Sequence, residues 1–167
     1  LKVLCKSKNK LSLVHNHKKT TDLPPNKSNI ELFFFILAST KFIQMKLTVI
    51  GGGNMGLTFA KGIHASGILN EQIMVLEKGQ ESIARLQSQE KDFIVFDTPE
   101  QCISEASIII LAVKPFHAAG VFENIKPHVN SEQLIISLMA GVTIDTIQKG
   151  LGIEKIVRTM PNLPAMI

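Results

Sequence analysis

Apolar positions in residues 45–167 gather into short runs rich in Val, Ile and Phe, and longer helical stretches separate these runs. Such alternation is typical of βαβ units that build a parallel sheet. The run Ile108–Val113 is apolar at every position, as in a strand that helices cover on both faces. The pattern predicts six strands, at residues 46–50, 73–77, 93–96, 107–113, 133–137 and 155–158.

These elements predict an α/β fold with a Rossmann-type, doubly wound, mostly parallel sheet of about six strands. Right-handed crossovers would give the strand order 3-2-1-4-5-6, with a crevice at the carboxyl ends of strands one and four. Gly67 and Gly150 are expected to end helices. The segment Thr98–Gln101 has the pattern of a capping box that begins another helix.

The net charge of +4 is divided unevenly along the chain. Residues 1–44 hold eight Lys and only Asp22 and Glu31 as acidic residues, which gives +6. Residues 45–167 hold ten basic and twelve acidic residues, which gives −2. The folded part therefore lacks the basic stripe of a nucleic-acid-binding protein, and no nucleic-acid partner is expected.

Residues 1–44 contain no Met before Met45 and show no strand or helix periodicity. We interpret them as a non-native upstream or disordered extension, and residues 45–167 as one domain. A targeting segment around Leu32–Ala38 is the alternative. No apolar run reaches the roughly 18 residues of a membrane span, so no membrane partner is expected. The two cysteines form no CxxC pair, which favours a cytoplasmic protein without a metal site.

A G-x-G-x-x-G motif follows the first predicted strand and predicts a dinucleotide site. Gly51 permits the turn, Gly53 lets the backbone approach a pyrophosphate, and Gly56 lets the helix pack on the strand. The candidate cofactor-binding residues of this loop are Ile50, Gly51, Gly52, Gly53, Asn54, Met55 and Gly56.

Glu77 lies 21 residues after Gly56, at the end of the second predicted strand. A carboxylate there accepts a hydrogen bond from a ribose 2′-OH and repels a 2′-phosphate, which favours NAD(H). Lys78 or Arg85 could neutralise a phosphate, so NADP(H) stays open, and Glu77 could equally be a solvated carboxylate.

Four ordered blocks carry a resemblance to the amino-terminal domain of pyrroline-5-carboxylate reductases. They are Ile50–Gly56 (IGGGNMG), Ala112–Pro115 (AVKP), Ser137–Val142 (SLMAGV) and Arg158–Ala165 (RTMPNLPA). The resemblance implies reduction of 1-pyrroline-5-carboxylate to L-proline by NADP(H) or NAD(H), in the cytoplasm, by a homodimer or higher homo-oligomer. The hydride chemistry belongs to the cofactor.

The later blocks add further candidate cofactor-binding residues, which follow strands four, five and six. Catalytic residues cannot be named, since the sequence shows no acid–base pair. The added candidates, with the acidic and basic residues after strand two, are Glu77, Lys78, Ala112, Val113, Lys114, Pro115, Ala140, Gly141 and Asn162.

The resemblance breaks off at Ile167, before the helical domain of about a hundred residues that the family carries. It therefore implies a fragment that is inactive alone. A nucleotide-binding remnant without turnover is one alternative, and a related Rossmann enzyme such as a coenzyme F420-linked NADP reductase is another. His64, His117, His128 and Cys102 are expected to be ordinary surface or packed residues.

Overall fold

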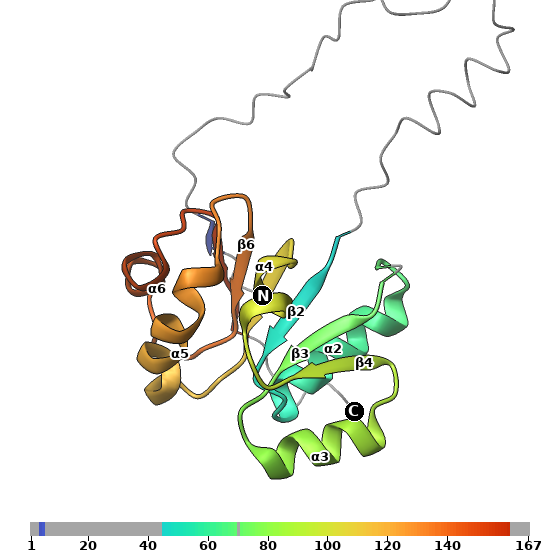
Figure 1. Ribbon diagram of the computed structural model, residues 1–167. Coiled ribbons are helices and arrows are strands. Elements are labelled where there is room, and N and C mark those ends of the chain that lie inside the picture. Colours follow the sequence, from blue (N-terminus) through green and yellow to red (C-terminus); the bar gives the residue numbers. More distant parts are fainter. Residues whose placement is uncertain (1–3, 6–44, 70, 161–167) are drawn as a thin grey trace, which may run out of the picture. The chain divides into compact units, whose positions relative to one another are not determined.

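A computed structural model describes residues 4–5, 45–69 and 71–160, and their strands form one seven-stranded sheet (Figure 1). The strands lie in the order β1-β7-β6-β5-β2-β3-β4. Their bounds are β1 (Leu4–Cys5), β2 (Leu47–Ile50), β3 (Ile73–Leu76), β4 (Phe93–Phe96), β5 (Ile108–Leu111), β6 (Leu134–Ser137) and β7 (Ile156–Arg158).

The six strands from β2 to β7 pair in parallel, and their order is the predicted doubly wound one. Each predicted strand is confirmed to within two residues at either end. The central strand β2 pairs with β3 on one side and β5 on the other, so that Val49 lies beside Val75 and Ile110. The chain reverses its winding direction at β2, and the carboxyl ends of β2 and β5 therefore frame a crevice.

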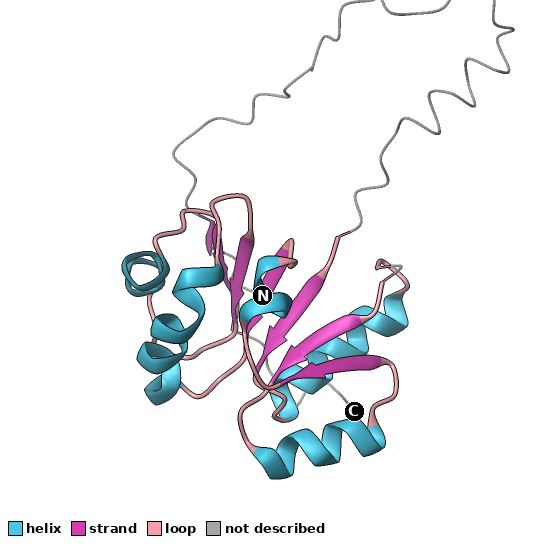
Figure 2. Cartoon of the chain, in the orientation of Figure 1, coloured by secondary structure: helices cyan, strands magenta, loops and turns pink. Residues whose placement is uncertain are grey.

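Helices cover both sides of this sheet, which Figure 2 shows as a magenta layer between cyan helices. Side chains alternate between the two faces because successive strand residues point in opposite directions. Val49 and Ile110 join one core cluster with Leu86, whereas Ile50 and Leu111 join the other. The helices are α2 (Asn54–Ser66), α3 (Gln80–Gln89), α4 (Glu100–Ser104), α5 (Ala118–Ile125) and α6 (Ile144–Leu151), with 3₁₀ turns η2 (Pro115–His117) and η3 (Lys126–His128).

Helix ends confirm one of the expected glycine caps and correct the other. Gly67 ends α2 with a left-handed backbone (φ 66°), and its N–H donates to the His64 carbonyl. The prediction that Gly150 ends a helix is wrong, because α6 continues to Leu151 and Gly152 adopts the left-handed cap (φ 76°). Gly150 lies inside α6, where an added Cβ would be 2.5 Å from the Phe122 ring. Its small size therefore serves the packing of α6 on α5.

The predicted capping box at Thr98 is also wrong. Helix α4 begins at Glu100 with Pro99 as its N-cap, and no side chain caps it. The Thr98 hydroxyl interacts with the Glu100 carboxylate instead, and this hydrogen bond lowers the pKa of Glu100 below its ordinary value. Because α4 has only five residues, a capping box would stabilise few helical hydrogen bonds.

Strand β1 was not expected, because two residues are too short to show an alternating pattern. Leu4 and Cys5 pair antiparallel with Arg158 and Val157 of β7. The rest of residues 1–44 lies outside the described residues, so their interpretation as an upstream or disordered extension stays a prediction. Among the helices of the described ranges, none has the length and apolar character needed to cross a membrane.

Candidate dinucleotide site

A cavity of about 410 Å³ lies at the carboxyl ends of the parallel strands, where the topology places the crevice. One wall comes from the ends of β2 and β3 with the residues that follow them. The opposite wall comes from the end of β5, from η2 and from α5. The residues that line the whole cavity are Ile50, Gly51, Leu76, Glu77, Lys78, Gly79, Val113, His117, Gly120, Val121, Asn124 and Ile125.

Backbone atoms leave no room for a side chain at Gly51 in the turn after β2 or at Gly56 in the first turn of α2. Gly51 has a positive φ of 100°, its N–H donates to the Leu76 carbonyl at 2.9 Å, and an added Cβ would lie 2.9 Å from the Ala112 carbonyl oxygen. A Cβ on Gly56 would overlap the Gly51 carbonyl oxygen. The turn, the start of α2 and the end of β5 are thus in direct contact, and only glycine fits at both positions.

Gly53 differs from these two, because an added Cβ would meet nothing within 4 Å. It is the N-cap of α2, and no side-chain hydrogen bond caps the helix. The open space in front of Gly53 therefore faces the positive end of a thirteen-residue helix. Such a helix start suits a phosphate group. The neighbouring Asn54 is exposed, whereas Met55 packs against the core.

Glu77 is half-buried at the end of β3 and accepts hydrogen bonds from the backbone. Its Oε2 accepts from the Gly52 N–H at 2.9 Å. Its Oε1 accepts from the Lys78 N–H at 2.9 Å and from the Gly79 N–H at 3.1 Å. Arg85 of α3 approaches the same loop, with Nη2 3.4 Å from the Gly52 carbonyl oxygen. Two loops that are far apart in the sequence therefore meet at one carboxylate.

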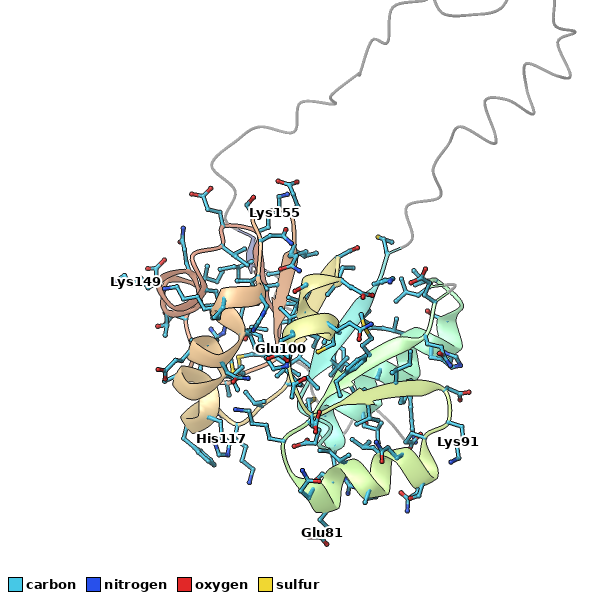
Figure 3. All side chains as sticks on the ribbon, viewed as in Figure 1. Glu81, Lys91, Glu100, His117, Lys149 and Lys155 are labelled. Carbon is cyan, nitrogen blue, oxygen red and sulfur yellow. The ribbon has the colours of Figure 1, made fainter. Side chains whose placement is uncertain are left out.

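The opposite wall contains residues that sequence analysis did not select. His117, Gly120, Val121 and Asn124 all line the cavity from η2 and α5. Figure 3 shows His117 just before the start of α5 and Glu81 at the start of α3, both at the end of the sheet to which the strands point. The spacing i, i+3, i+4, i+7 was the available signal, since it defines one face of the helix after the AVKP block.

Other candidates lie near this cavity without lining it. Ala112 packs against the glycine turn through its backbone and Cβ. Lys114 is exposed, with Nζ 5.8 Å from the centroid of the exposed Phe116 ring. Pro115 and Gly141 line a second hollow of about 610 Å³ between α5 and α6, and Ala140 is exposed beside it. Asn162 lies outside the described residues.

No strong acid–base or metal chemistry is visible in the described part of the chain. Burial raises the pKa of the Cys102 thiol to about 11, so this cysteine is protonated at neutral pH. Within those residues, no group of three or more His, Cys, Asp and Glu side chains could hold a metal ion. The arrangement is suited to binding a nucleotide: a helix start for phosphate and a largely apolar slot beside it.

Comparisons with known proteins agree with this geometry. Residues 46–141 match the family described as NADP oxidoreductase, coenzyme F420-dependent. The pyrroline-5-carboxylate reductase of Escherichia coli is 35% identical over 127 residues, which are 75% of this chain and 47% of that protein. The chain thus spans about half the length of the curated relatives it matches.

Two solved structures extend the comparison. The pyrroline carboxylate reductase of Plasmodium falciparum, solved with NADP bound, is 30% identical with a TM-score of 0.60 and covers 72% of this chain and 43% of that one. The pyrroline-5-carboxylate reductase of Coxiella burnetii is 32% identical with a TM-score of 0.64 and covers 73% and 46%. These similarities confirm the resemblance that the four sequence blocks indicated.

Proposed function

Because the chain belongs to the family described as NADP oxidoreductase, coenzyme F420-dependent, we propose that it provides the dinucleotide-binding half of an NAD(P)H-dependent reductase. The substrate of the proposed enzyme is 1-pyrroline-5-carboxylate and its product is L-proline. The observation that carries the proposal is the cavity between the glycine turn and α5, at the switch point of a doubly wound sheet.

The start of α2 and the neighbouring cavity together fit a dinucleotide. An added Cβ on Gly53 would meet no atom within 4 Å, and this open space lies in front of the uncapped start of α2. N–H groups and the helix dipole at such a helix start stabilise a pyrophosphate. Ile50, Leu76 and Val121 give part of the cavity an apolar lining, which suits an aromatic base. Lys78 and Gly79, which line the cavity after β3, are our candidates for contacts with a ribose and its substituents, and Glu77 supports the loop that holds them.

When bound, a reduced nicotinamide supplies the hydride that a C=N bond accepts. The chain's own share is to orient the dinucleotide and to hold it against the ends of β5 and β6. Ala112 and Val113 stand beside the glycine turn, while Lys114, Pro115, Ala140 and Gly141 follow the same two strand ends. We assign these residues and Asn162 to the cofactor's nicotinamide side and name no catalytic residue.

The choice of substrate rests on relatives of 30% identity or above that are named as pyrroline-5-carboxylate reductases, among them those of Escherichia coli and Coxiella burnetii. The family description favours a second candidate, an F420-linked NADP reductase. The blocks AVKP and RTMPNLPA favour the first, because they are the motifs by which the chain resembles the proline-forming enzymes. A dinucleotide-binding remnant without turnover is the third candidate. A cytoplasmic location and assembly of the full-length form into a homodimer or higher homo-oligomer complete the proposal.

The proposal is tested in two stages. Calorimetric titration of the chain with NADH and with NADPH is expected to show binding of at least one, and binding of neither would contradict the dinucleotide site. A chimera in which this chain replaces the matched half of the Escherichia coli relative is then expected to oxidise the cofactor with pyrroline-5-carboxylate. A chimera that binds cofactor but oxidises it only with an F420 substrate would favour the second candidate, and the absence of any turnover the third.

A further inference from the structure

We propose that Glu77 is a positioning residue that ties two loops of the cavity together, and that it does not select NADH over NADPH. The inference deepens the proposed function and rests on it. It differs from the expectation that the sequence position of Glu77 raises, which is a carboxylate that accepts a ribose hydroxyl and excludes a 2′-phosphate.

Glu77 accepts hydrogen bonds from backbone N–H groups of two loops. A carboxylate has about four acceptor positions on its two oxygens. In Glu77 both oxygens are engaged by the backbone, Oε2 by Gly52 and Oε1 by Lys78 and Gly79. Gly52 precedes the start of α2, and Gly79 is the N-cap of α3. One side chain therefore fixes the relative placement of the two helix starts that border the cavity.

The backbone groups explain why this tie is needed. N–H groups at a helix start have no partner within the helix, and leaving a buried N–H group without an acceptor is costly. Of the three donors to Glu77, Gly52 is buried, whereas Lys78 and Gly79 are exposed. Gly79 has no side chain that could cap α3, and the structure shows no side-chain cap from that residue. Glu77 supplies the missing acceptor from the preceding turn. Three of its about four acceptor positions are therefore already used by the backbone.

Positive charge surrounds the Glu77 carboxylate. Three N–H donors and the positive end of α3 offset the negative charge of the carboxylate. Lys78 is exposed at the mouth of the cavity, and Arg85 reaches the carbonyl of Gly52. A 2′-phosphate near Glu77 would meet two cations besides one carboxylate whose charge is offset by three N–H donors. NADPH is therefore accommodated in spite of an acidic residue at the position that normally excludes it.

The test compares the full chain with its Glu77→Gln and Glu77→Ala variants, and with Glu81→Gln as a matched control on the first turn of α3 (Figure 3). Titration with NADH and NADPH should show that Glu77→Gln weakens both by a similar factor of about tenfold, whereas Glu81→Gln changes neither. The ratio of the two affinities should stay within about twofold of the original. A shift of tenfold or more in favour of NADPH would overturn the proposal.

Amide hydrogen exchange supplies a readout that a general loss of stability would not imitate. The amides of Gly52, Lys78 and Gly79 should exchange slowly in the unchanged chain, faster in Glu77→Gln and fastest in Glu77→Ala, in which no acceptor remains. Amides in the middle of α2 and α3 should keep their rates. Rapid exchange of Gly52 and Gly79 in the unchanged chain would overturn the tie even if the alanine variant did not fold. If the chain bound no dinucleotide, the proposed function would be contradicted. The exchange rates would still show whether Glu77 ties the two loops together.

Discussion

The two walls of the cavity are built in different ways. The wall at the ends of β2 and β3 is held by backbone hydrogen bonds to Gly51 and to Glu77, and it has no space for a Cβ at Gly51 or Gly56. The wall formed by α5 is held by Phe122 and Ile125, which are buried in the core, and its exposed Gly120 has nothing within 4 Å of an added Cβ. One wall is fixed by its own contacts, and the other is a surface of a packed helix.

This difference separates folding from binding. A change in the glycine turn alters contacts that the domain needs in order to fold, so stability and binding should fall together. A change on the cavity face of α5 alters only the space that a ligand would fill, so binding should fall alone. Paired glycine substitutions on the two walls therefore test whether the cavity has been described correctly.

The largest effect is expected from Gly56→Ala, because its new methyl group would overlap the Gly51 carbonyl oxygen. Overpacking of this kind lowers the free energy of unfolding by about 1–3 kcal/mol, and it should also displace the turn enough to abolish dinucleotide binding. Thermal unfolding and calorimetric titration measure the two effects. The matched control is Gly62→Ala in the same helix, which has open space and should stabilise α2 by about 0.5–1 kcal/mol. Equal stabilities of the two variants would contradict the tight packing.

The next effect is expected from Gly120→Leu on the opposite wall. The side chain would enter the cavity between Val121 and Leu76, and dinucleotide affinity should fall at least about tenfold, or 1.4 kcal/mol. Stability should not fall, since replacing a helix glycine removes a cost of about 1 kcal/mol. Gly120→Ala should keep most of the affinity and gain the same stability. Unchanged affinity in the leucine variant would show that the ligand does not occupy this cavity.

The contrast between the walls also explains what the sequence could predict. The glycine turn and the six parallel strands were predictable because their physical requirements are local: a positive φ at Gly51, and apolar runs in buried strands. The α5 wall was missed because His117 and Asn124 acquire a role only when α5 is folded against the sheet. Gly150 was misread for the same reason, since its contact with Phe122 joins two helices. The three bonds of Glu77 likewise depend on loops that meet only in the fold.

A smaller and selective effect is expected from Arg85→Gln, because Arg85 is exposed and reaches the carbonyl of Gly52. The guanidinium would pair with a 2′-phosphate, so NADPH should lose about tenfold in affinity while NADH changes little. Lys91→Gln, which removes a cation beyond the other end of α3 (Figure 3), is the control and should change neither. The selective loss of NADPH affinity in Arg85→Gln should become smaller at high ionic strength, because salt screens the interaction between the guanidinium and the phosphate. An equal loss for both would place Arg85 outside the 2′ position.

The smallest effect is expected at the opposite, amino ends of the strands, where the Lys46 ammonium lies 2.7 Å from Glu105 before β2 and β5 begin. The hydrogen bond between them lowers the pKa of Glu105 and raises that of Lys46. The contribution of Glu105 to the free energy of unfolding is therefore complete above its ordinary pKa, and it is lost as the pH falls through the lowered pKa. The contribution of Lys46 is lost only as the pH rises through its raised pKa. Glu105→Gln should lower the Tm at pH 7 by no more than about a degree, because the pair is exposed, and should remove this part of the acid dependence. Dinucleotide affinity should not change at any pH, and a loss comparable to that of Gly120→Leu would mean that the site is not confined to the carboxyl ends of the strands.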